Sequence, residues 1–124
     1  MKHAINWFEI PVVNYDRASK FYSTILNAQV HRLESNPTPY GLLPSDGETA
    51  VGGALAQGDD YVPATNGTVV YLNAGTPANI DTMLGRVEAA GGKVVAPKMS
   101  IGENGWIAFV LDTEGNKVGL HAPN

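Results

Sequence analysis

The chain has 124 residues, of which 44% are hydrophobic and 16% are charged, and its formal net charge is −4. This balance is typical of a single globular domain, and the excess of acidic residues disfavours nucleic-acid binding, which requires a basic surface. Because the sequence contains no cysteine, disulfides, thiolate metal sites and a cysteine nucleophile are excluded.

Residues 5–12 predict the first strand. Side chains alternate between the two faces of a strand, so Phe8, Ile10 and Val12 share one face, whereas Trp7 and Glu9 lie on the other. We expect the first set to pack under a helix and the second set to lie on the opposite face of the sheet, toward whatever lies across it.

An amphipathic helix follows, because apolar residues recur there at the spacing of one buried helix face: Ala18, Phe21, Tyr22, Ile25 and Leu26. Asn14 is a suitable N-cap, and Asn27 can end the helix in a left-handed conformation. Residues 29–33, 40–43 and 49–55 then predict three strands. Gly52 and Gly53 inside the last of these indicate a bulge, a close approach by ligand or backbone, or simply a weakened strand.

Residues 58–67 are polar and irregular, and we interpret them as a linker. Residues 68–74 predict a strand, and Thr76 followed by Pro77 predicts the start of a second helix. The apolar face of this helix holds Ile80, Met83, Leu84 and Val87. A β-branched stretch at 93–95, a loop at 99–104, a strand at 105–111, a tight turn at 112–116 and a strand at 117–121 complete the chain. Whether residues 97–101 form another strand is open.

The same order of elements therefore occurs twice. We predict an α+β domain of two tandem βαβββ modules, at about 1–57 and about 68–124, joined by the linker at about 58–67. Each module would form a curved mixed sheet, and a cavity between the modules is the natural place for a ligand.

The chain resembles the vicinal-oxygen-chelate superfamily, the group of glyoxalase I, bleomycin-resistance proteins and extradiol dioxygenases. The resemblance covers nearly the whole chain and is closest to small, single-domain glyoxalase-like proteins. It rests on the following segments in this order: Phe8-Glu-Ile-Pro-Val12, Arg17-Ala18, Phe21-Tyr22, Gly52-Gly53-Ala54-Leu55, Val70-Tyr71-Leu72, Arg86-Val87-Glu88-Ala89-Ala90-Gly91-Gly92, Asp112-Thr-Glu-Gly-Asn116 and Gly119-Leu120-His121.

The resemblance implies a metal position on the first and fourth strands of each module, where His, Glu or Gln side chains hold a divalent ion. In this sequence the first-strand positions fall on Trp7 and Val69, and the fourth-strand positions fall on Gly53 and Gly119, to within about one residue for the glycines. None of these side chains can ligate a hard cation. We therefore predict no metal site and no cofactor, and we leave open a divalent metal held by other residues.

Glu9, Tyr71 and His121 are the polar side chains expected to project inward near these positions. Glu9 and His121 form the candidate acid/base pair, because their pKa values can be tuned by the surroundings. The alternative is structural, with the polar groups satisfying one another in a closing cavity.

Aromatic residues are candidates for a pocket wall, in which the polar groups would serve as anchors. The predicted ligand-binding set is Trp7, Glu9, Tyr40, Gly53, Tyr71, Trp106, Phe109 and His121. The aromatic members could equally belong to the core.

Together these features favour a metal-independent, glyoxalase-like protein that binds a small, partly apolar organic molecule, with positive charge on the ligand suited to Glu9 and the aromatic rings. The alternatives are a lyase or isomerase acting on a small carbonyl compound, with Glu9 or His121 as base, and a drug-sequestering resistance protein. The resemblance implies a homodimer, with a monomer as the alternative.

No nucleic acid or membrane partner is expected. The N-terminal residues lack the apolar stretch of a signal peptide, and no apolar run reaches the roughly 20 residues that span a membrane. We therefore expect a cytoplasmic protein.

Overall fold

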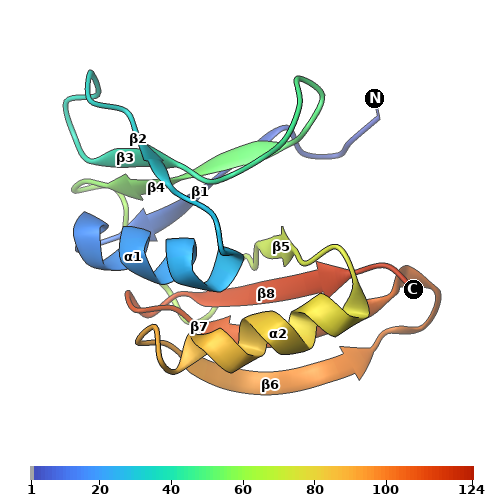
Figure 1. Cartoon of the computed structure of the whole chain (residues 1–124). Coiled ribbons are helices and arrows are strands. Elements are labelled where there is room, and N and C mark those ends of the chain that lie inside the picture. Colours follow the sequence, from blue (N-terminus) through green and yellow to red (C-terminus); the bar gives the residue numbers. More distant parts are fainter. Residues whose placement is uncertain (1) are drawn as a thin grey trace.

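The computed structural model describes residues 2–124 and shows an α+β fold of two four-stranded mixed sheets and two α-helices (Figure 1). The first sheet has the order β1-β4-β3-β2, in which β1 runs parallel to β4 and the other pairs are antiparallel. Its elements are β1 (Trp7–Val12), α1 (Tyr15–Leu26), β2 (His31–Arg32), β3 (Tyr40–Leu42) and β4 (Gly52–Gln57).

The second sheet repeats this plan with the order β5-β8-β7-β6, and β5 runs parallel to β8. Its elements are β5 (Tyr71–Asn73), α2 (Pro77–Val87), β6 (Lys93–Ser100), the 3-10 helix η1 (Gly102–Asn104), β7 (Trp106–Leu111) and β8 (Lys117–Ala122). The two sheets confirm the predicted fold class, which does not close into a barrel.

Three predicted boundaries need correction. Residues 97–100 belong to β6, a single bulged strand that continues to Ser100. The loop predicted at 99–104 therefore begins too early. The strand predicted at 68–74 is limited to β5, an edge strand that pairs only with β8 and ends where the Asn73 side chain accepts a hydrogen bond from the Gly75 amide. The strand predicted at 29–33 is reduced to the two residues of β2.

The helix ends confirm the capping predictions. The Asn14 side chain accepts a hydrogen bond from the Arg17 amide at the start of α1, and Asn27 ends this helix with a φ of 51°. Thr76 caps α2 by accepting from the Asn79 amide. Over residues 2–124, neither helix is long and apolar enough to cross a membrane.

Both helices lie on the inner sides of the sheets and contact each other (Figure 1). Ile10, Val12 and Leu55 of the first sheet and Val118 and Leu120 of the second sheet belong to one buried cluster with the apolar helix faces. Since strand residues alternate, the neighbouring side chains on each sheet lie on the face that no helix covers. We call these two surfaces the open faces.

Buried polar contacts tie the two halves together. Asp112, which is 5% exposed, accepts hydrogen bonds from the Tyr22 hydroxyl at 2.6 Å and from the Asn116 side chain at 2.9 Å. The Asn116 amide group also donates to the Pro11 carbonyl at 2.7 Å. These bonds supply partners to polar groups inside the core and fix the turn after β7 against the first module.

Glu114 in the same turn forms a second link between the halves. Its carboxylate accepts hydrogen bonds from the backbone amides of Val13 and Asn14 and from Arg17 Nε at 2.7 Å. Burial by itself would raise the pKa of Glu114, but these hydrogen bonds outweigh it and hold the pKa below its ordinary value of 4.5. The turn is therefore an anchor for the start of α1.

Two glycines in and after α2 give a matched stability test. A Cβ on Gly92 would lie 2.5 Å from the Leu111 carbonyl oxygen and 2.5 Å from the fully buried ring of Phe21, whereas a Cβ on Gly85 would meet nothing within 4 Å. We expect Gly92→Ala to lower the free energy of unfolding by about 1–3 kcal/mol, because neither neighbour can yield without disturbing the core. Gly85→Ala should raise it by about 0.5–1 kcal/mol through helix propensity. Urea unfolding of both variants measures the difference, and equal effects would contradict this packing.

Candidate functional site

The open face of the first sheet brings together three of the predicted ligand-binding residues. Trp7 and Glu9 extend from β1, and Tyr40 extends from β3 on the far side of β4. The register pairs Glu9 with Ala54 and Tyr40 with Ala56, so small side chains lie on the strand between them. Larger residues on β4 would stand between Glu9 and Tyr40.

Hydrogen bonds join these residues into a network. The Trp7 indole N–H donates to Tyr40 Oη at 3.0 Å, and the Tyr40 hydroxyl donates to Glu9 Oε2 at 2.7 Å. The Tyr61 hydroxyl donates to Glu9 Oε1 at 2.9 Å. We refer to Trp7, Glu9, Tyr40 and Tyr61 as the Glu9 cluster.

Tyr61 is the member of the cluster that the sequence analysis missed. It lies in the segment interpreted as a polar linker, just after a turn in which its amide donates to the Gly58 carbonyl at 3.1 Å. This turn follows the end of β4 and returns the tyrosine over the open face. The only signal in the sequence is an aromatic residue within a polar segment, which does not specify a contact with Glu9.

The electrostatics of the cluster follow from the carboxylate. Hydrogen bonding to Glu9 raises the pKa of Tyr61 above its ordinary value of 10.0, and burial adds to this effect. Burial raises the pKa of Tyr40, and the hydrogen bond to Glu9 raises it further. Within residues 2–124 the ion pairs are Arg17–Glu114 and Lys98–Asp81, so no described cation pairs with Glu9. The tyrosines therefore remain donors at neutral pH beside a carboxylate without a positive partner.

The open face of the second sheet gathers another group of predicted residues. Tyr71 packs against Phe109 with ring centroids 5.7 Å apart, and the Lys117 ammonium lies 4.5 Å from the Phe109 ring centroid. His121 shares this face, and its Nε2 lies 2.6 Å from the Asn104 carbonyl oxygen. Since a carbonyl can only accept, Nε2 carries the proton and Nδ1 is the nitrogen left for other contacts.

The structure separates the two remaining predicted residues from these groups. Trp106 lies on the helix-facing side of β7, opposite to Phe109, and packs against the core. Gly53 also faces inward, where a Cβ would lie 2.4 Å from the Phe8 ring, and it is Gly52 that pairs with Trp7. The paired glycines therefore mark a close approach of side chains from β1, and β4 pairs with β1 without a bulge.

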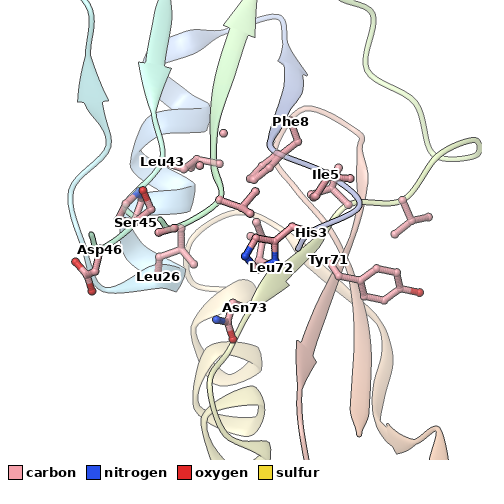
Figure 2. A pocket seen from close by; sticks show the side chains of 17 residues that line it. His3, Ile5, Phe8, Leu26, Leu43, Ser45, Asp46, Tyr71, Leu72 and Asn73 are labelled. Carbon is pink, nitrogen blue, oxygen red and sulfur yellow. The ribbon is translucent and has the colours of Figure 1, made fainter. Parts of the chain in front are cut away.

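A cavity of about 780 Å³ lies between the modules (Figure 2). Its lining includes Gly53 and Tyr71 from the predicted set, and also His3, Phe8 and Asn73. In Figure 2 the Tyr71 ring is directed outward, away from His3 and Asn73. Trp7, Glu9 and Tyr40 do not line this cavity, so the predicted site residues are divided among two open faces and the space between the modules.

The family's metal positions do not fit a metal in this chain. The register places Trp7 beside Gly52 and Tyr71 beside Gly119, and Val69 precedes β5. The predicted positions Trp7, Val69, Gly53 and Gly119 and their neighbours Gly52 and Tyr71 therefore offer an indole, an isopropyl group, a phenol and glycines. They lack a carboxylate or imidazole. Across residues 2–124, no three His, Asp or Glu side chains come close enough to hold a metal ion.

Comparison with known proteins agrees with this architecture. The family model of the Glyoxalase/Bleomycin resistance protein/Dioxygenase superfamily matches residues 4–120, and the chain belongs to this superfamily. Among curated proteins it is similar to CFP32 of Mycobacterium bovis and Mycobacterium tuberculosis, which carries a glyoxylase name, with 25% identity over 96% of the chain. The chain spans about half the length of these relatives, 45% in each case.

Solved structures share the fold at low identity. A glyoxalase/bleomycin resistance protein from Albidiferax ferrireducens T118 superposes with a TM-score of 0.79 at 17% identity, covering 98% of this chain and 100% of that chain. A mutant of the fosfomycin resistance protein FosX from Listeria monocytogenes, in complex with Mn(II) and 1S,2S-dihydroxypropylphosphonic acid, gives a TM-score of 0.65 at 16% identity, covering 100% of this chain and 93% of that chain.

The hydrogen bond to Glu9 leads to a prediction about the pKa of Tyr61. Glu9→Gln removes the negative charge that holds the phenolic proton, so the pKa of Tyr61 should fall toward its ordinary value. Tyrosine Cζ chemical shifts followed against pH by NMR measure this change. Tyr22, whose raised pKa comes from burial and Asp112, is the internal control and should not respond. An unchanged Tyr61 midpoint in the variant would contradict the hydrogen bond.

Proposed function

We propose that this chain is a small-molecule-binding protein that uses the Glu9 cluster without a metal ion. The observation that supports the proposal is the exposed carboxylate held by two tyrosine hydroxyls between aromatic side chains. Such a combination of apolar surface and a few oriented polar groups is typical of small-ligand sites. Trp7 is 45% exposed, so its ring offers surface to a ligand.

Metal independence is supported by the chemistry of the family positions. Enediolate-forming reactions in this superfamily depend on a cation that polarises a carbonyl, and the side chains at those positions here are aromatic, aliphatic or absent. The Listeria FosX structure, which shares this fold, contains Mn(II). The difference between the two proteins would then lie in side chains and not in the fold.

A lyase or isomerase is the second candidate function, and His121 is the residue that favours it. Its Nδ1 is available while Nε2 is held by the Asn104 carbonyl, which is the arrangement of an oriented base. Glu9 is less suited to this role, because each of its oxygens already accepts a tyrosine hydrogen bond. A drug-sequestering protein would use the same cluster without turnover.

A screen of small organic compounds by thermal shift, with and without EDTA, tests the proposal. We expect some compounds to raise the melting temperature of the protein, and EDTA to leave those shifts unchanged. Tyr61→Phe, which removes one donor to Glu9, should reduce the shifts while keeping the fold. Stabilisation that disappears with EDTA, or a stoichiometric metal content in the purified protein, would contradict metal independence.

We also propose that two copies associate through the open faces of their second sheets. This face exposes aromatic surface, since Tyr71 is 44% exposed and packs against Phe109. Covering these rings with a second copy would remove apolar area from water, and it would leave the Glu9 cluster on the first sheet accessible to a ligand.

Sedimentation equilibrium tests this association. We expect a dimer for the native chain, and we expect Tyr71→Lys to shift the equilibrium toward monomer, because it places a charge in the apolar contact. Val62→Lys is the matched control, since Val62 is 73% exposed and lies on neither sheet. A native chain that sediments as a monomer at all accessible concentrations would contradict the proposal.

A further inference from the structure

The arrangement of protons in the Glu9 cluster leads us to infer the class of its ligand: a protonated amine attached to an apolar or aromatic body. This inference rests on the proposed function, because it names the ligand of the same cluster. It depends on counting the hydrogen-bond donors and acceptors that remain free once the network has formed.

Every side-chain donor in the cluster is already used. An indole has one N–H and no acceptor, and a tyrosine hydroxyl has one proton. The Trp7 proton goes to Tyr40, and the Tyr40 and Tyr61 protons both go to Glu9. All three donors are therefore used in hydrogen bonds that lead to the Glu9 carboxylate, from Trp7 through Tyr40 on one side and from Tyr61 on the other.

What remains for a ligand is acceptor capacity. Each Glu9 oxygen has a second lone pair, and the Tyr61 oxygen accepts no hydrogen bond from a described residue. No cation from residues 2–124 pairs with the carboxylate. A ligand that supplies N–H donors and positive charge would therefore satisfy what the cluster lacks.

The aromatic rings favour the same charge. The face of an indole or phenol ring attracts a cation through its quadrupole, by about 0.5–1 kcal/mol at exposed sites and more when water is excluded. Tyr40 and Tyr61 bond to Glu9 directly and Trp7 bonds to it through Tyr40, so three such rings lie near the carboxylate. An ammonium group on Glu9 would lie among these rings, and an attached apolar body could cover the exposed Trp7 surface.

The same accounting argues against acceptor ligands. A carboxylate, a phosphonate or the carbonyl of a 2-oxoaldehyde needs donors, and the four side chains of the cluster have none left. An anion would also meet the unpaired charge of Glu9. The cluster therefore prefers a positively charged ligand to a neutral or negative one, and this preference can be measured separately from binding itself.

Benzylammonium, benzyl alcohol and benzoate are suitable probes, because they share one ring and differ in charge. The chain has two tryptophans, so the indole region of a ¹H–¹⁵N NMR spectrum should contain two signals, which Trp106→Phe assigns. We expect benzylammonium to shift the Trp7 indole signal and to leave that of Trp106, on the other sheet and facing the core, unchanged. Benzyl alcohol should bind about tenfold more weakly, and benzoate should cause no shift.

Glu9→Gln should lower the affinity for benzylammonium about tenfold, to the affinity for benzyl alcohol. The matched control is Glu88→Gln, at the exposed C-cap of α2, which should bind benzylammonium as tightly as the native chain does. If Glu9→Gln does not fold, as far-UV circular dichroism would show, the three probes on the native chain still decide the matter. Equal binding of the three probes at Trp7, or preference for benzoate, would overturn the ammonium class and leave a binding site in place. No shift at Trp7 with any probe would overturn the binding function as well.

Discussion

The packing of both helices into one shared core is the constraint on which the rest of the structure depends. Because α1 and α2 contact each other and bury the inner sides of both sheets, every second residue on each strand is turned to the opposite side. The Tyr22–Asp112–Asn116 contacts hold this arrangement across the two halves. The open faces, and with them the Glu9 cluster, are a direct consequence of where the helices lie.

The proposed role of the Glu9 cluster differs from that of a metal site in the same fold. In the position where relatives of this superfamily would hold a cation with protein oxygen and nitrogen atoms, this chain presents an indole next to a glycine. Two residues further along β1, the Glu9 carboxylate accepts hydrogen bonds from the Tyr40 and Tyr61 hydroxyls. A metal site offers positive charge to substrate oxygens, whereas the proposed site offers the negative charge of Glu9, so the inferred ligand has the opposite polarity.

Much of the fold could be predicted from local signals. The alternation of Phe8, Ile10 and Val12, the helix caps at Asn14, Asn27 and Thr76, and the repeat of the element order all reflect short-range physics that a sequence displays directly. The family membership follows from the same segments. The edge strands β2 and β5 are shorter than the sequence predicts. Each pairs with one neighbour only, so its length depends on that neighbour and not on its own residues alone.

The composition of the site was only partly accessible. The sequence identifies Trp7, Glu9 and Tyr40 only as separate candidates, because their contact depends on the strand order β1-β4-β3 and on small residues on β4. Tyr61 depends on a turn that folds back over the sheet, which no periodicity reports. The separation of Trp106 from Phe109 was accessible in principle, because positions three apart on one strand lie on opposite faces.

The most direct test of the central claim is a high-resolution crystal structure of the purified protein, with anomalous scattering data collected to identify any metal. The account predicts that the Tyr40 and Tyr61 hydroxyls are hydrogen-bonded to the Glu9 carboxylate, that the Trp7 indole is bonded to Tyr40, and that no anomalous peak lies within about 2.6 Å of a Glu9 oxygen. A transition-metal ion coordinated by Glu9, or tyrosine rings turned away from it, would contradict the account.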